Sequence, residues 1–98
     1  MFIVLLKFAD QRSRAAEWMQ AHKAWLQKGF DDGVFLASGS LAERQGGCIL
    51  AQGPDLPTLQ QRLADDPFVK HAVVHAEVIE ATITNAHAAL AGPLGMGA

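Results

Sequence analysis

One histidine on a predicted amphipathic helix is the residue of this sequence best placed for chemistry. His22 lies between Trp18 and Trp25, on the stripe of apolar side chains that one helix face would turn toward a core. A ring in that position is shielded from water and can carry a proton to or from a bound molecule. A core histidine with one structural hydrogen bond would show the same spacing, so the pattern alone leaves both roles open.

The other histidines and the serines form no recognisable metal or nucleophile motif. His71 and His75 are four positions apart, a spacing that joins two ligands on a helix, but the residues around His75 are typical of a strand. We therefore interpret these two and His87 as surface histidines. No nucleophile elbow is present. The sequence predicts no metal site and no cofactor.

Composition indicates one small globular domain and excludes several classes of partner. Half of the 98 residues are hydrophobic and 18% are charged, which is not the composition of a disordered chain. The eight basic residues are scattered among ten acidic ones, so we expect no nucleic-acid partner. The apolar run 2–6 is too short to cross a membrane. The single cysteine, Cys48, suits a reducing, cytoplasmic compartment.

Hydrophobic periodicity predicts the order strand, helix, strand, strand, helix, strand. The predicted strands cover residues 2–8, 34–41, 46–53 and 72–84. The first helix is predicted from Arg14 to Phe30 and is followed by Gly33 as a left-handed residue. The second begins at 54–58 with Asp55 as its N-cap, and we expect Asp66 at or beyond its end, because a residue before proline disfavours the helical region. The apolar stripe of the first helix comprises Ala15, Trp18, Met19, Trp25, Leu26, Gly29 and Phe30.

Alternation along the second strand predicts which side chains share a face. It puts Phe35 and Gly39 on one face of the sheet, and Ser38 and Ser40 on the other. Gly39 indicates a bulge, or a close approach by a ligand or by backbone. The two serines can serve a pocket only if their face lines it.

This order of elements predicts an α+β, ferredoxin-like βαββαβ fold with a four-stranded antiparallel sheet. Two helices cover only one face of such a sheet, whereas the strands are apolar on both. We therefore expect a homodimer in which the open sheet faces pack together. Residues 1–84 form the predicted domain, and 85–98 form a C-terminal tail that includes a short helix up to Leu90.

The sequence resembles the YCII-related family, which has the dimeric α+β-barrel version of this fold. The resemblance covers about the first 83 residues. It is carried by His22 with Trp25-Leu26, Gly33 with the 37–39 strand, Gly46-Gly47, and most specifically the Ala-Asp-Asp-Pro-Phe run 64–68.

The resemblance implies a catalytic pair in a pocket beside the sheet. Carried over by position, the pair is His22 as general acid or base and Asp66, which orients it, whereas Asp65 is solvated or capping. A family member removes HCl from a chlorinated ring-cleavage product, which implies lyase or dehydrochlorinase-type chemistry on a small organic acid. Ser38, Gly39 and Ser40 would then bind an oxyanion or carboxylate, and Phe68 would form an apolar wall.

Two departures from the family pattern prevent transfer of the substrate itself. Many members have Gly-Pro where this chain has Gly39-Ser40, and many close the last strand with Pro and an aromatic residue where this chain has Glu80-Ala81. The alternative function is a small-molecule binding or accessory module without turnover, because fold alone does not imply function. A subunit-assembly domain with a filled pocket is a third option.

Overall fold

The sheet has four strands in the order β2-β3-β1-β4, and each neighbouring pair is antiparallel. The computed structural model describes residues 1–53 and 55–95. The strands are β1 (Phe2–Phe8), β2 (Phe35–Ser40), β3 (Gly46–Ala51) and β4 (Val74–Glu80). The helices are α1 (Ala15–Asp31), α2 (Leu56–Ala64), α3 (Pro67–Lys70) and α4 (Ala88–Ala91), with 3-10 turns η1 (Arg12–Arg14) and η2 (Ala42–Arg44). The predicted ferredoxin-like α+β fold is confirmed.

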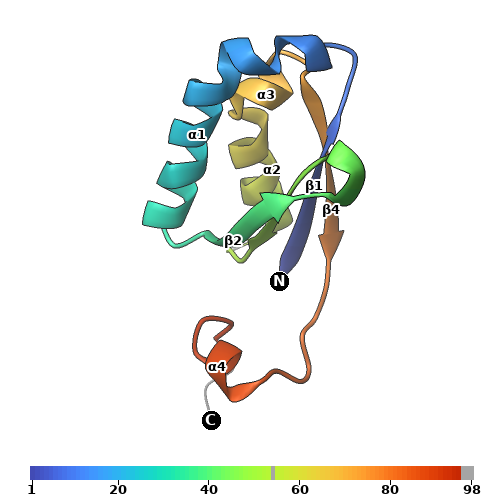
Figure 1. Cartoon of the computed structure of the whole chain (residues 1–98). Coiled ribbons are helices and arrows are strands. Elements are labelled where there is room, and N and C mark those ends of the chain that lie inside the picture. Colours follow the sequence, from blue (N-terminus) through green and yellow to red (C-terminus); the bar gives the residue numbers. More distant parts are fainter. Residues whose placement is uncertain (54, 96–98) are drawn as a thin grey trace.

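The core lies between the sheet and the helices on one of its faces. β1 buries alternate side chains, Phe2, Val4 and Leu6, toward α1 and α2, which lie on the same side of the sheet (Figure 1). Leu59 and Leu63 of α2 close this layer from the helix side. Burying each of these large apolar side chains contributes roughly 1.5–3 kcal/mol to stability. This layer therefore fixes how α1 lies over the sheet.

The chain between α2 and β4 differs from the prediction. The expected helix end before Pro67 is correct, but residues 67–70 form a further short helix, α3, whose N-cap is Asp66. Asp55 caps α2 as predicted and accepts a hydrogen bond from Thr58 N at 2.8 Å. The part of the predicted helix start at 54 lies outside the described residues. Aspartate before proline suits both features, because it ends one helix and can cap the next.

Three of the four strands, β2, β3 and β4, are shorter than predicted. β4 starts at Val74 because Ala72 has a positive φ of 57°, and it ends at Glu80 instead of 84. β2 and β3 are also shorter than expected at their ends. α1 is displaced by one residue at each end, and Gly33 has the expected positive φ, of 75°.

A bulge at Leu36 reverses the predicted faces of β2. The pairing of β2 with β3 shifts register between Phe35 and Ala37. Phe35 pairs with Ala51 and Ser38 pairs with Ile49, both of which face the helices. The predicted separation of Phe35 from the serines was therefore wrong. The bulge lies at Leu36 and not at Gly39, and no backbone approaches Gly39 closely, since a Cβ there would meet nothing within 4 Å.

In the described part of the chain, neither α1 nor α2 covers the opposite face of the sheet (Figure 1). Its apolar side chains include Leu50, which is 37% exposed, and Ile79, which is 50% exposed. After β4 the chain runs away from the sheet to α4, where Leu90 is also exposed (Figure 1). Within the described ranges, no helix is long and apolar enough to cross a membrane.

Candidate active site

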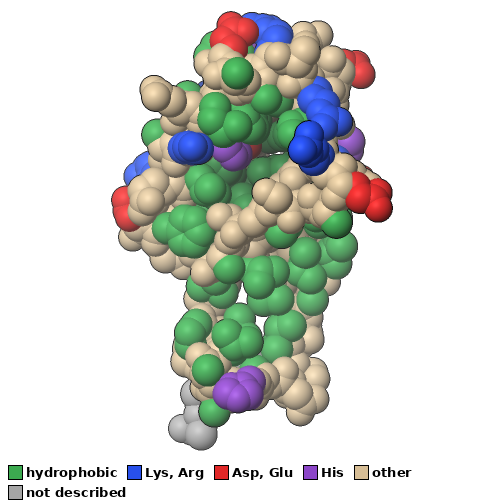
Figure 2. Space-filling model, viewed as in Figure 1, with side chains coloured by type: hydrophobic (Ala, Val, Ile, Leu, Met, Phe, Trp, Pro, Cys, Tyr) green, Lys and Arg blue, Asp and Glu red, His purple; other side chains and the backbone are tan. Residues whose placement is uncertain are grey.

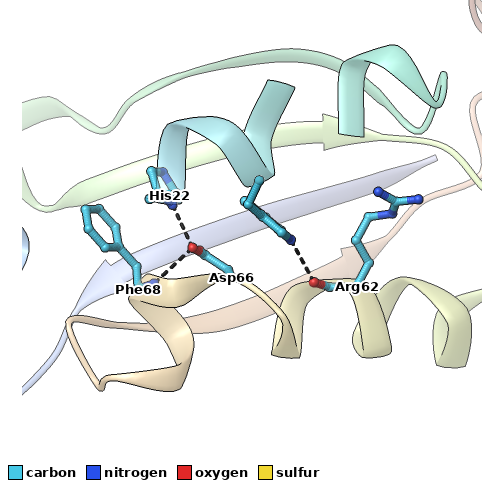
Figure 3. Close-up of polar contacts among 5 residues, drawn as sticks. His22, Arg62, Asp66 and Phe68 are labelled. Atoms are coloured by element: carbon cyan, nitrogen blue, oxygen red, sulfur yellow. Dashed lines mark hydrogen bonds and ion pairs between the residues drawn. The ribbon is translucent and has the colours of Figure 1, made fainter. Parts of the chain in front are cut away.

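His22 and Asp66 meet between α1 and the start of α3. His22 Nδ1 lies 2.7 Å from Asp66 Oδ1 (Figure 3). The His22 side chain is 14% exposed and that of Asp66 is fully buried. When the Asp66 carboxylate is ionised it can only accept hydrogen bonds, and Nδ1 is then the donor in this contact. The other ring nitrogen, Nε2, is then left as a proton acceptor.

Local backbone structure fixes the position of Asp66. The backbone N–H of Phe68 donates to Asp66 Oδ1 at 3.0 Å, as expected for the N-cap of a helix. The same oxygen therefore accepts from the helix start and from the imidazole. Asp66 Oδ2 is buried and has no hydrogen-bond partner within the described chain. The carboxylate is thus held by α3 in a place where, among the described residues, the His22 ring is its only side-chain hydrogen-bond partner.

Two aromatic side chains hold the His22 ring. Phe68 stacks flat on it, with ring centroids 4.1 Å apart and an interplanar angle of 6°. The Trp25 ring lies 5.7 Å away, and its indole N–H donates to the carbonyl oxygen of Arg62 at 3.0 Å. The His22 side chain lines the neighbouring cavity, while Phe68 covers one face of its ring and Asp66 engages Nδ1.

A cavity of about 260 Å³ adjoins His22 at the end of the sheet where β1, β2 and β3 meet α1. Figure 2 shows it as a hollow with apolar walls and a histidine within it. Its volume suits a small organic molecule the size of one substituted ring. A second hollow, of about 230 Å³, continues it under Ser38, and the two share Gly39 and Ser40.

Small residues on the helix-facing side of the sheet leave room for this cavity. Gly47 pairs with Leu6 on one side and with Ser40 on the other. A Cβ at Gly46, whose φ is 137°, would lie 2.0 Å from the Leu6 carbonyl oxygen, so this strand start requires glycine. A larger side chain at 40 or 47 would occupy the space in front of His22.

The paired charges near Trp25 stabilise the end of α1 and the adjoining helix. Arg62 donates to Asp32 at 2.9 Å, and Lys28 lies 3.5 Å from the same carboxylate. The hydrogen bond from Arg62 holds the pKa of Asp32 below its ordinary value, and Lys28 adds to the effect. Because the Arg62 carbonyl oxygen also binds Trp25, this ion pair supports the aromatic side of the site.

The model of the YCII-related domain matches residues 1–82 of the sequence. This chain belongs to the YCII-related family. The resemblance predicted from the sequence is thereby confirmed, and both members of the histidine–aspartate pair lie within the matched YCII-related region. A search among curated proteins found no significant match.

A solved structure supports the fold of this YCII-related chain. It is 5-chloro-2-hydroxyhydroquinone dehydrochlorinase from Burkholderia phenoliruptrix AC1100, in complex with 2,5-dihydroxybenzoquinone. The TM-score is 0.67 at 13% sequence identity, over 84% of this chain and 94% of that one. At this identity the likeness concerns the arrangement of the elements alone.

The structure brings the predicted site residues of the YCII-related chain to one place. Gly39, Ser40 and Phe68 line the cavity beside His22, and Ser38 lines the adjoining hollow. The ring of Phe68, predicted as an apolar wall, lies mainly against the imidazole. Asp65 is exposed at the end of α2.

Several contributors to the site were not predicted from the sequence. Trp25 was given only as part of the apolar stripe of the first helix, although its spacing of three from His22 places it near the ring. Lys23 and Met19 line the cavity from α1, and Met19 is 37% exposed instead of buried. Lys23 carries no signal in the sequence, because its position beside the stripe is typical of a solvated helix face.

The remaining histidines do not converge on a metal site. In the part of the chain that the structure describes, no three metal-ligating side chains cluster. His71, interpreted as a surface residue, is half-buried and stacks on Trp18 at 3.7 Å. His75 is exposed on β4, and His87 caps α4 through Nδ1, which accepts from Ala89 N.

Two other hollows are larger but lack converging polar groups. One of about 590 Å³ lies between α2 and β4 and is lined mainly by aliphatic side chains. Another of about 470 Å³ lies between the tail and the open end of the sheet and is also mainly apolar. Neither adjoins the histidine–aspartate pair, so the His22 cavity is the best candidate for chemistry.

Proposed function

We propose that this YCII-related protein is an acid–base enzyme that acts on a small organic acid by dehydrochlorinase-type elimination. The observation that carries the proposal is the His22–Asp66 contact at 2.7 Å, at the wall of a cavity of single-ring size. Asp66 holds the proton on Nδ1, so Nε2 is free to take a proton from carbon. The dehydrochlorinase of similar fold offers a matching reaction class.

The reaction step is an elimination in which His22 is the base. Nε2 removes a proton from a carbon of the substrate, and the electron pair of that C–H bond forms a new double bond as the adjacent C–Cl bond breaks. Chloride leaves, and the imidazolium formed next to Asp66 later releases its proton to water. Ser38, Ser40 and the Gly39 backbone would bind the developing oxyanion, and Phe68 would hold the ring of His22.

Chloride release provides the test. With chlorinated organic acids that carry a hydrogen on the carbon next to a saturated C–Cl carbon, the wild type should release chloride, and His22→Gln and Asp66→Asn should be roughly 10²–10⁴-fold slower. His71→Gln is the matched control, because this half-buried histidine stacks on Trp18 and does not line the cavity. Turnover that persists in His22→Gln would rule out the proposed base. Binding without turnover in the wild type would favour the accessory-module alternative.

We also propose that the protein forms a homodimer through the open face of the sheet. Exposed apolar side chains on that face, Leu50 and Ile79, would be covered by a second copy. The proposed catalytic unit comprises residues 1–84, and residues 85–98 form a C-terminal tail. The single cysteine supports a reducing, cytoplasmic setting for this unit.

A further inference from the structure

The basic residues of this chain divide into two groups. Within the described chain, four of the eight basic side chains form ion pairs with carboxylates, namely Lys7, Arg14, Lys28 and Arg62. The other four are Arg12, Lys23, Arg44 and Lys70. Their distribution is informative, because a cation left without a carboxylate is available to a bound anion.

Three of the four unpaired basic residues lie around the His22 cavity. Lys23 lines it from α1. Arg12 lies over the ring of Phe8, another lining residue, at 4.2 Å from its centroid. One Arg12 nitrogen donates to the carbonyl oxygen of Arg44, in the turn that leads to the lining residue Gly46. Basic side chains lie on both sides of the hollow in Figure 2.

The described residues that line the cavity include no acidic side chain. The nearest carboxylate, Asp66, is fully buried and already bound to His22 and to the Phe68 N–H. Among the described residues that line the cavity, Lys23 is therefore the one with a fixed positive charge. Walls of low polarity, such as Leu6 and Leu26, strengthen the effect of each charge on a bound molecule.

We propose that Lys23 binds the negatively charged group of the substrate at the mouth of the cavity, with the substrate ring between Lys23 and His22. The inference rests on the proposed acid–base function and defines its substrate class as small planar anions, such as carboxylates, enolates or phenolates. Held at this end, the ring directs a C–H bond toward Nε2. Lys23 is a substrate-binding residue here, and Arg12 adds to the positive field.

The test compares an anion with a neutral molecule of the same shape. Benzoate and benzamide are titrated into the whole protein, and backbone NMR signals of Ser40 and Gly47 report binding in the cavity. Lys23→Met keeps the length of the side chain and removes its charge. Lys70→Met is the matched control, because it makes the same change in net charge at a residue that does not line the cavity.

We expect benzoate to bind the wild type, and Lys23→Met to weaken that binding roughly five- to twentyfold, since a charge-assisted hydrogen bond is lost. Lys23→Arg should restore it, Lys70→Met should leave it unchanged, and benzamide should not distinguish the variants. Three results would overturn the proposal. They are no benzoate binding at millimolar concentration, benzoate binding that Lys23→Met and Lys70→Met weaken equally, or benzamide binding that Lys23→Met weakens as much as benzoate binding.

These results separate the anion site from the proposed catalysis. If benzoate binding depends on Lys23 but no chlorinated acid is turned over, the anion site stands and the elimination fails. If chloride release depends on His22 while benzoate binding does not depend on Lys23, the elimination stands and the anion site fails.

Discussion

His22 and Asp66 are 44 positions apart in the chain, yet Nδ1 of His22 lies 2.7 Å from Oδ1 of Asp66. Asp66 caps α3 and binds the imidazole with the same oxygen. The contact is therefore built into the start of a helix, where the backbone determines the direction of the carboxylate. Any change that disturbs this cap should also disturb the histidine.

The first prediction concerns Asp66→Asn. The amide keeps the size of the side chain but removes the charge and introduces a buried NH₂ group without an acceptor. We expect the free energy of unfolding to fall by about 1–3 kcal/mol, measured by urea denaturation. Ring ¹⁵N shifts in mildly alkaline buffer should show that His22 no longer holds its proton solely on Nδ1. An unchanged tautomer would mean that Asp66 does not orient the ring.

The second prediction tests the stacked ring. Phe68 is 6% exposed and lies flat on His22, so Phe68→Leu should cost about 1–2 kcal/mol of stability and lower the rate by loosening the imidazole. Phe30→Leu is the control, because its ring packs edge-on against Phe35 and does not touch the histidine. If Phe68→Leu and Phe30→Leu were equally stable and lost the same share of the chloride-release rate, a positioning role for Phe68 would be contradicted.

The third prediction fills the cavity. Ser40 lies on β2 beside Gly47 and lines the space in front of His22. Ser40→Val adds apolar volume there, so we expect little change in unfolding free energy, within about 0.5 kcal/mol, but loss of ligand binding. Ser38→Val places the same change in the adjoining hollow, and a stronger effect there would relocate the binding site.

The sequence predicts the fold well because its signals are periodic and repeated. Alternating burial along β1 and the stripe of α1 are set by the positions of many side chains, so errors at single residues matter little. The site, in contrast, depends on local features that each occur once and have no periodic pattern. The bulge at Leu36 reverses the face of every later residue in β2. A single inserted residue leaves the alternation of apolar and polar residues on either side intact, so the sequence pattern does not show where the bulge lies.

Contacts between distant segments explain the other differences. Asp66 before Pro67 predicted the end of α2, but a helix of four residues is too short for periodicity to reveal α3. The hydrogen bond from Trp25 to the Arg62 carbonyl oxygen depends on how α1 packs against α2. The pairing of His22 with Asp66 came from resemblance to a family and not from spacing, because no local rule relates positions so far apart.

The fourth prediction concerns pH. The hydrogen bond from Arg62 lowers the pKa of Asp32 in the folded protein. The stability that this carboxylate contributes is therefore complete above its ordinary pKa, near 4, and is lost as pH falls through the lowered value. In Asp32→Asn, unfolding monitored by circular dichroism should depend less on pH below about 4 than it does in the wild type. Parallel pH curves for the two proteins would contradict the role of this pair.

The fifth prediction tests the homodimer. Ile79 is 50% exposed on the open face of the sheet, opposite Ile3 of β1. If a second copy covers this face, Ile79→Lys buries an uncompensated charge and should weaken association by about 3 kcal/mol, a factor of roughly 100 in Kd. Sedimentation velocity over a concentration series measures this shift toward monomer. Met19→Lys provides the control, because Met19 is a similarly exposed apolar residue on α1, on the helix side of the sheet. A monomeric wild type, or equal dissociation in both variants, would exclude the open face as the interface.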